Sequence, residues 1–197
     1  MADRRKGSDR RKKERRHKGT AAILAAKAEK GAGVEAFGWT ILAHPLFLDQ
    51  IERLVAAAEA EASGLTRLPG PNAKLLAHLL DLAFDKIPRD PGNTAFRQGG
   101  TPGDDRKHWF RGTTGNGRYR LFYRFQSGAR IIVYAWVNDE NSLRTYGSST
   151  DAYAVFAKML NEGNPPDSFD SLVAAASSRS AIDRLETVAK RRPGTRR

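Results

Sequence analysis

The chain has 197 residues, a formal net charge of +12 and no cysteine. The lack of cysteine excludes disulfides and thiolate metal sites, and it is compatible with a reducing cytoplasm. No apolar run approaches the roughly 20 residues that a membrane-spanning helix needs. We therefore expect a cytoplasmic protein that does not enter a membrane, with one core-bearing domain of ordinary size.

The positive charge lies at the two ends of the chain. Residues 1–30 contain 12 Lys and Arg against 4 Asp and Glu, residues 179–197 contain 7 against 2, and the stretch between them is nearly neutral. Runs such as "RRKKERRHK" repel themselves and cannot form a core. We therefore predict disordered basic tails at 1–36 and 173–197 around a domain of residues 37–172. Such tails either solubilise the protein or attract the phosphates of nucleic acid.

The first half of the domain reads as a strand followed by two helices. "FGWTILAHP" predicts a short strand that ends at Pro45. "LFLDQIERLVAAAEAEA" places apolar residues at helical spacing, and "AKLLAHLLDLAFDKI" does the same after Asn72, a residue suited to capping a helix. These two segments predict a packed helical pair. The Pro- and Gly-rich stretch "PRDPGNTAFRQGGTPGDD" predicts a long loop.

The second half reads as three strands and a helix. The strand candidates are "KHWFRG", "GRYRLFYRF" and "RIIVYAWVN", with Asn116-Gly117 and Ser127-Gly128 between them. These turn residues predict two antiparallel hairpins. A loop, "DENSLRTYGSS", leads into the predicted helix "TDAYAVFAKMLNEG". The order of elements predicts an α+β domain with helices packed on a small antiparallel sheet.

The central strand candidate carries arginine on one face. Alternate side chains of a strand point to opposite faces. The face that we expect to join the core carries Tyr119, Leu121, Tyr123 and Phe125. The opposite face carries Arg118, Arg120, Phe122 and Arg124. Depending on the register, the neighbouring strands add Lys107 or Arg111 on one side and Tyr134 or Trp136 on the other.

A basic face with interleaved aromatic rings suits single-stranded nucleic acid, because guanidinium groups bind phosphates and rings stack on bases. The residues that we expect to contact RNA are Arg97, Lys107, Arg111, Arg118, Arg124 and Trp136. The alternative is that this is simply the solvated face of the sheet, where arginine is common. Composition alone does not decide between the two.

Several motifs resemble the YhaV family of bacterial type II toxins, which belongs to the RelE/ParE superfamily. They are "GRYRLFYRF", "WVNDENSLRTYG" and "TDAYAVFAKMLNEGNPP", with "GWTILAHPLF", "AKLL", "AFRQG" and "HWFRG" nearer the N-terminus. The resemblance runs from about Phe37 to Leu172 and stops short of both basic tails. It implies a RelE-like fold, in which a helical pair and a C-terminal helix flank a small antiparallel sheet.

The resemblance also implies an activity and its partners. It points to a metal-independent endoribonuclease that needs no cofactor, cleaves mRNA either free or on the ribosome, and so inhibits translation. A PrlF-type antitoxin would neutralise it in a hetero-oligomer. Two other functions stay open: a ParE-like toxin that poisons gyrase, and a protein that binds RNA without cutting it.

The resemblance assigns roles to four residues. The strand arginine of the superfamily matches Arg120, and Arg144 and Tyr146 fall in the region of its further arginine and tyrosine. Since arginine keeps its proton, Arg120 and Arg144 would stabilise charge. Tyr146 would transfer a proton, although the pKa of a free tyrosine is about 10. His108 has the better intrinsic pKa for this task, but we expect it to face the core.

Asp139 and Glu140, in "NDEN", are weaker candidates for a metal site or a general base. Two adjacent acids without a third converging ligand are more typical of loop caps or salt-bridge partners. We therefore expect no metal site.

Overall fold

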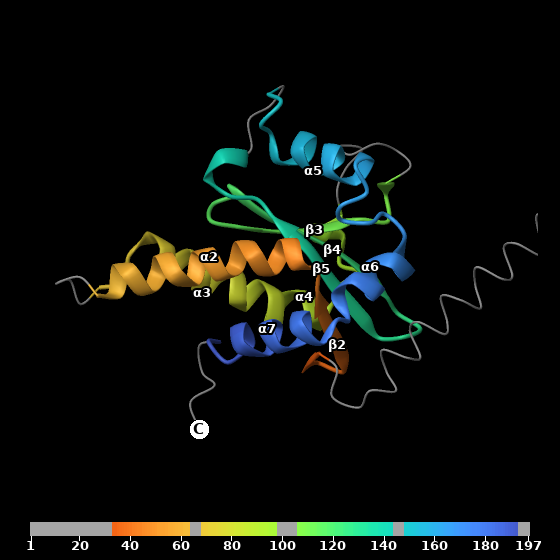
Figure 1. The fold of residues 1–197 in the computed structure, drawn as a ribbon, viewed down its shortest axis with the longest axis horizontal. Helices are drawn as coiled ribbons and strands as arrows, with labels where there is room; N and C mark the ends of the chain where they lie inside the picture. Colours follow the sequence, from red (N-terminus) through yellow and green to blue (C-terminus); the bar gives the residue numbers. More distant parts are fainter. Residues whose placement is uncertain (1–32, 64–67, 98–105, 144–147, 193–197) are drawn as a thin grey trace, which may run out of the picture.

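The computed structural model of this chain describes residues 33–63, 68–97, 106–143 and 148–192 (Figure 1). The described part has the predicted α+β class. Its five-stranded sheet has the order β1-β2-β5-β4-β3. The strands are β1 (Val34–Ala36), β2 (Trp39–Ala43), β3 (Phe110–Thr114), β4 (Tyr119–Gln126) and β5 (Ile131–Val137).

The sheet is mixed, whereas the sequence predicts an antiparallel one. Strand β2 runs parallel to β5, with Ile41 opposite Ile132, while β1–β2, β3–β4 and β4–β5 are antiparallel. A parallel pair needs a long crossover connection. Here the chain between β2 and β5 contains the helical pair and the β3–β4 hairpin, so β5 returns to lie beside β2. Both predicted hairpins are present.

One face of the sheet, which we call the first face, packs against the predicted helical pair. This pair consists of α2 (Pro45–Ala62) and α3 (Pro71–Asp81), and α3 continues through a π-helical turn, Leu82–Lys86, into the short α4 (Ile87–Arg89). The core on this side includes Leu121 and Tyr123 of β4. The alternation predicted for β4 is confirmed on this face.

The opposite face, which we call the second face, is also covered. Helices α5 (Ala152–Asn161) and α6 (Phe169–Ala176) pack on it. Phe122 of β4 stacks on Phe156 of α5 with ring centres 4.1 Å apart. The reading of this face as an open, solvated surface is therefore wrong over most of its area. Any arginine on it lies beside or beneath a helical layer.

The C-terminal region is not a disordered tail as far as residue 192. Residues Arg179–Ala189 form helix α7, which packs on β1, β2 and α2. Its buried positions include Ile182, Leu185 and Val188, three residues apart, and Leu185 and Val188 join the core of the first face. The high charge of this segment obscures its apolar stripe. Strand β1 likewise lies inside the segment predicted as an N-terminal arm, whose first 32 residues are outside the described part.

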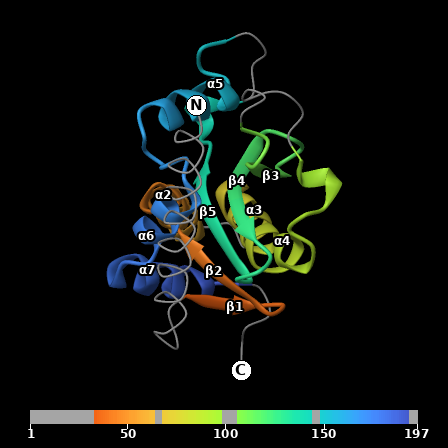
Figure 2. The ribbon, with the colours of Figure 1, turned by 90° about the vertical axis from the view of Figure 1, so that its right-hand side faces the viewer.

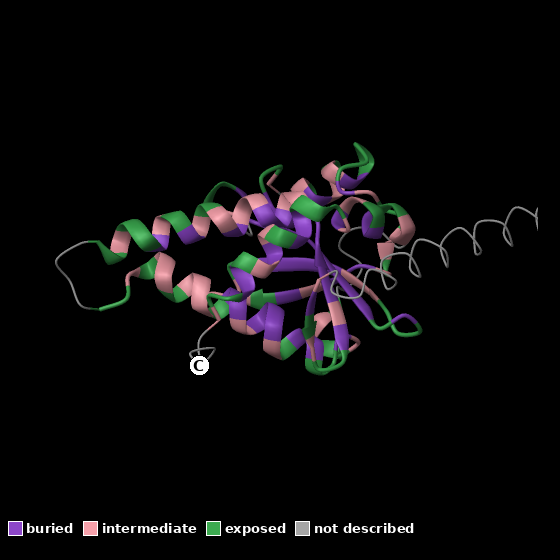
Figure 3. Cartoon of the chain, turned by 60° about the horizontal axis from the view of Figure 1, so that its bottom comes forward, coloured by how far each residue is buried: buried purple, intermediate pink, exposed green. Residues whose placement is uncertain are grey.

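The helical pair extends beyond the sheet. Strands β2 and β5 are almost entirely buried, whereas α2 and α3 become more exposed toward their connecting loop (Figure 3). Helix α5 lies at the opposite end of the domain from β1 (Figure 2). Among the helices in the described ranges, none is long and apolar enough to cross a membrane.

We predict that Leu185→Ala destabilises the protein by about 2–5 kcal/mol, because it removes a fully buried side chain from α7. The matched control is Thr187→Ala, an exposed position on the same helix, which should change the unfolding free energy much less. Urea denaturation followed by circular dichroism measures both. If the two variants unfold at the same urea concentration as the unchanged protein, α7 is not part of the core.

Candidate active site

Arg120 is a buried arginine on the second face of β4, with only 7% of its surface exposed. Its Nη1 donates to the carbonyl of Arg118 at 3.3 Å, and its guanidinium lies 5.5 Å from the centre of the Tyr153 ring. Its Nε, however, is buried without a hydrogen-bond partner. A buried donor left unpaired typically costs about 1–3 kcal/mol, and more when it is charged. Such a group needs an explanation.

Arg111, on the neighbouring strand β3, also has a buried donor without a hydrogen-bond partner. This donor is its Nε, while its Nη1 donates to Thr113 Oγ1 at 2.8 Å. Thr113 lies directly opposite Arg120 in the β3–β4 register. The Arg111 guanidinium is therefore directed along β3 toward Arg120. In the described part of the chain, these are the only two buried side-chain polar atoms without a partner.

The charge of this arginine pair is not neutralised by the described residues. No Asp or Glu among them forms an ion pair with Arg111 or Arg120. Arg118, in the hairpin turn directly before β4, is exposed. Planar guanidinium donors match the oxygens of a phosphate or carboxylate better than those of water. The arrangement is suited to bind an anion at the β3–β4 edge of the sheet.

Asn138, just after β5, fixes the backbone around Arg120. Its Oδ1 accepts a hydrogen bond from the Arg120 backbone N–H at 2.6 Å. Its Nδ2 donates to the carbonyls of Arg118 at 3.1 Å and Ser142 at 3.0 Å. Asn138 is itself only 3% exposed. One buried amide thus joins the start of β4 to the turn that precedes residues 144–147.

That turn is a 3-10 helix, η4 (Glu140–Ser142), capped by Asp139. Burial alone would raise the pKa of Asp139, but hydrogen bonds from Ser142 and Gln50 outweigh it and lower the pKa. The expectation that Asp139 is a loop cap is confirmed. Within the described ranges, no three His, Asp or Glu side chains gather in a group that could hold a metal ion.

A second polar cluster surrounds Asp167, in the connection between α5 and α6. Its Oδ1 accepts from Trp109 Nε1 at 2.7 Å and lies 2.9 Å from His108 Nε2. Burial would raise the pKa of Asp167, but these two hydrogen bonds and the nearby Arg124 hold it below its usual value. His108 is thus a partly exposed partner of a carboxylate, and the expectation that it faces the core is wrong.

Arg124 belongs to this cluster and not to the arginine pair. Its Nη1 donates to the Asp167 carbonyl, and its guanidinium lies 5.6 Å from the Trp109 ring and 5.4 Å from the Phe169 ring. Burial lowers its pKa. Trp109 is four positions before Thr113, which corresponds to about 13 Å along an extended strand. The structure therefore does not bring His108 or Arg124 to Arg120.

The remaining residues that the sequence predicts for the site lie in different environments. Arg144 and Tyr146 lie outside the described residues. Trp136 is 4% exposed and stacks on Phe122 and Phe156, so its assignment as an RNA-stacking ring is wrong: it belongs to the core. Lys107 and Arg97 are exposed, and the Arg97 guanidinium lies 5.5 Å from the Phe110 ring.

Two features of the site are absent from the sequence-based prediction. The pairing of Arg111 with Arg120 depends on the strand register, which the sequence does not reveal. Asn138 is the first residue of "NDEN", in which the sequence indicates a possible function only for the two acids. Its one available signal is position, since an amide directly after a buried strand often binds backbone groups of a neighbouring turn.

Comparisons with known proteins identify related chains. Residues 41–177 match the family model Toxin_YhaV, described as a toxin with endonuclease activity, of toxin-antitoxin system. The chain is 42% identical over 140 residues to "Toxin YhaV" of Escherichia coli O6:H1, and the match covers 68% of this chain and 90% of that relative. It is 41% identical over 140 residues, with the same coverage, to "Ribonuclease toxin YhaV" of Escherichia coli K12. No solved structure gives a significant match.

We predict that Asn138→Ala lowers the free energy of unfolding by about 1–3 kcal/mol, because it leaves the buried Arg120 N–H without an acceptor. Asn138→Asp keeps an acceptor for that N–H but turns its second oxygen toward the carbonyls of Arg118 and Ser142. It should therefore destabilise the protein as well. Urea denaturation measures both, with the exposed Asn141→Ala as control. Equal stability of Asn138→Asp and the unchanged protein would contradict the assigned hydrogen bonds.

Proposed function

The chain belongs to the YhaV family of toxins with endonuclease activity, and on this premise we propose that it is a metal-independent endoribonuclease. In this proposal it cleaves mRNA, inhibits translation and is neutralised by a PrlF-type antitoxin. The observation that carries the proposal is the pair Arg111 and Arg120, each of which has a buried Nε without a hydrogen-bond partner. The phosphate at the scissile bond is the anion that this pair binds.

Cleavage needs only groups of the RNA and the protein. The ribose 2′-hydroxyl attacks the neighbouring phosphorus, a new P–O2′ bond forms, and the P–O5′ bond breaks. The 2′-hydroxyl proton goes to a base, and the departing 5′ oxygen receives a proton from an acid. The products are a 2′,3′-cyclic phosphate and a 5′-hydroxyl. Negative charge increases on the phosphate oxygens during the attack.

Arg120 and Arg111 would stabilise that charge. Donors that are fixed before the reaction stabilise the transition state without reorganising during it. Arg120 is fixed by the Tyr153 ring, by the Arg118 carbonyl and by the hold of Asn138 on its backbone. Because two guanidinium groups supply positive charge at the phosphate, the mechanism has no step that requires a metal ion.

Proton transfer is assigned to residues near the end of η4. Arg144 and Tyr146 follow this turn in the chain, and Asn138 ties the turn to Arg120. We place Tyr146 as the acid or base and Arg144 as a further charge stabiliser. His108 is paired with Asp167 at a distance from Arg120, which supports a role in binding a flanking part of the RNA instead of proton transfer.

The antitoxin is proposed to inhibit by charge. An acidic side chain of the antitoxin that enters the site would pair with Arg111 and Arg120 and exclude the phosphate. The toxin and the antitoxin then form a hetero-oligomer in the cytoplasm. The exposed Arg118 and Lys107 would contact either the RNA or the antitoxin.

We predict that Arg120→Ala lowers the rate of RNA cleavage about 10²–10³-fold, as typical for loss of one preorganised charge-stabilising donor. Arg120→Lys should restore only part of the rate, because an ammonium group lacks the planar fork of donors. The measurement is cleavage of one naked RNA in EDTA at saturating concentration, with mapped ends and a ribosome-bound mRNA alongside.

The matched control is Arg179→Ala, an exposed arginine on α7 at the other edge of the sheet, whose ion pair with Asp183 is expected to contribute little. It should cut at the unchanged rate. A gyrase supercoiling assay run in parallel tests the ParE-like alternative. Cleavage by folded Arg120→Ala at the unchanged rate would reject the proposed phosphate site.

A further inference from the structure

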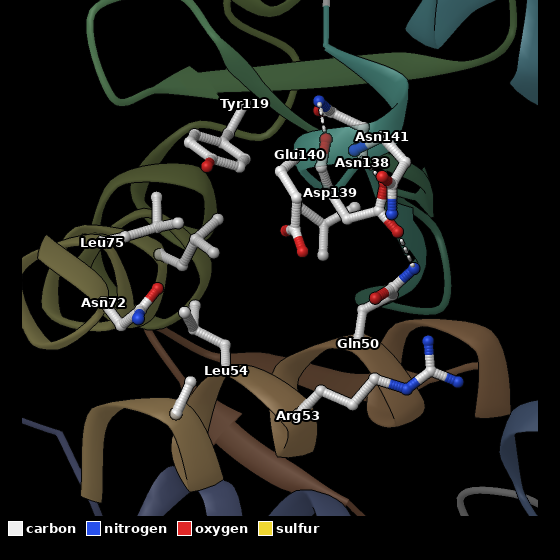
Figure 4. Close-up of a pocket in the computed structure, with 13 residues that line it drawn as sticks. Gln50, Arg53, Leu54, Asn72, Leu75, Tyr119, Asn138, Asp139, Glu140 and Asn141 are labelled. Atoms are coloured by element: carbon white, nitrogen blue, oxygen red, sulfur yellow. Dashed lines mark hydrogen bonds between the residues drawn. The ribbon is translucent and has the colours of Figure 1, made fainter. Parts of the chain in front are cut away.

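A cavity of about 400 Å³ lies between α2, α3 and the η4 turn (Figure 4). Its apolar walls are formed by Leu54 and Leu75, together with Leu79, and the ring of Tyr119 closes one side. Its polar and charged lining residues are Gln50, Arg53 and Asn72 from the helices, and Asn138, Asp139, Glu140 and Asn141 from the end of β5 and the η4 turn. The volume falls in the range of small-molecule pockets, and the cavity combines apolar walls with polar groups that could orient a ligand.

The Tyr119 ring is held in place from behind by a glycine. A Cβ atom at Gly115 would lie 2.8 Å from the ring carbon Cδ2 of Tyr119, so only glycine allows this close approach. The φ of Gly115 is also positive, at 58°. In the described part of the chain the Tyr119 hydroxyl has no hydrogen-bond partner. An aromatic ring fixed on one side and open to a cavity on the other is suited to stack on a planar ligand.

The charged residues that line the cavity are two acids, Asp139 and Glu140, and one cation, Arg53. Asp139 and Gln50 are bound to each other at 3.3 Å. Glu140, in contrast, is exposed and makes no hydrogen bond or ion pair with the described residues. Its carboxylate points into the cavity in Figure 4. A carboxylate accepts hydrogen bonds, so it favours a ligand edge that carries N–H donors.

The cavity adjoins the arginine pair through the backbone. Tyr119 directly precedes Arg120, and Asn138 both lines the cavity and binds the Arg120 N–H. Tyr119 also lines a second hollow of about 520 Å³, where Lys74 and Arg118 contribute positive charge and no acid contributes negative charge. A chain that passes from the arginine pair around the end of β4 thus meets basic groups and then the cavity.

We propose that this cavity binds an unpaired nucleobase next to the scissile phosphate, with Tyr119 stacking on the base and Glu140 selecting it. The inference rests on the proposed function, since it extends the path of the same RNA. Guanine fits best, because its Watson–Crick edge presents two adjacent N–H donors to one carboxylate. The neighbouring phosphates are bound by Lys74 and Arg118.

Nucleic acid explains the cavity better than an antitoxin side chain does. An acidic antitoxin segment would place a carboxylate beside Glu140, and like charges repel. RNA instead offers phosphates to the basic hollow and the N–H donors of a base to the Glu140 carboxylate.

The test measures base preference by binding and by cleavage. Short RNAs with guanine or adenine at each position beside the cut, and with a 2′-deoxyribose at the scissile nucleotide to block cleavage, are titrated by fluorescence anisotropy. The same sequences with all 2′-hydroxyl groups are then cut. We expect guanine to bind about tenfold more tightly than adenine at one position, as for a good two-pronged contact, and to give the matching cleavage preference.

Glu140→Gln should abolish most of this preference while the protein still binds RNA. Tyr119→Ala should weaken binding of both sequences, whereas Tyr119→Phe, which keeps the ring, should bind nearly as well as the unchanged protein. Glu186→Gln on α7 is the matched control and should keep the full preference. If Glu140→Gln retains the guanine preference, or if no position shows one, the proposed pocket is wrong.

The outcomes separate this inference from the proposed function. A protein that binds guanine preferentially through Glu140 but cuts no RNA would reject the ribonuclease proposal and support the pocket. A protein that cuts RNA with the same preference before and after Glu140→Gln would support the ribonuclease proposal and reject the pocket. If Tyr119 and Glu140 variants lose only antitoxin affinity, the cavity is an antitoxin site and the inference is overturned.

Discussion

Strand β4 lies in a sheet that helices cover on both faces. A side chain that is buried there must either pack against apolar neighbours or find partners for its polar atoms, and this is the constraint on β4. Leu121, Phe122 and Tyr123 satisfy the constraint by packing into the two cores. Arg120 does not, since it carries a charge at 7% exposure with a donor left unpaired. Buried charges are costly unless they are paired. A fold that keeps such a group, with a second guanidinium of the same kind directed toward it, has a site prepared for an anion.

The prepared site depends on a single amide for its connection to the rest of the molecule. Asn138 binds the backbone on both sides of Tyr119 and also holds the η4 turn. The residue between the two anchored positions is thereby fixed as well. The proposed phosphate site on the second face and the cavity on the first face therefore share one support. In the proposed function, the two opposite faces of this strand end would then bind one substrate in a fixed relative position.

Much of the fold could be predicted from local patterns, and the site only in part. The alternation along "GRYRLFYRF" predicted which side chains of β4 share a face, and Asn116-Gly117 predicted the hairpin. Helix α5 of the second face was predicted, whereas α6 on the same face and α7 on the first face were not, because polar and charged residues interrupt their apolar positions. Arg111 and Trp136 were assigned the same role, yet one extends toward Arg120 and the other stacks in the core. Register and long-range packing decide that difference, and neither is a local property.

The central claim is that Arg120 is retained for its ligand and not for the stability of the fold, and its unfolding free energy tests this most directly. The measurement is urea denaturation of the free protein and of Arg120→Met, which keeps much of the side-chain volume and removes the buried charge. Replacing a buried unpaired charge by an apolar group is often neutral or stabilising. We predict that Arg120→Met is at least as stable as the unchanged protein. A loss of about 2 kcal/mol or more, as for an ordinary core truncation, would show that Arg120 is a structural residue and would contradict the account.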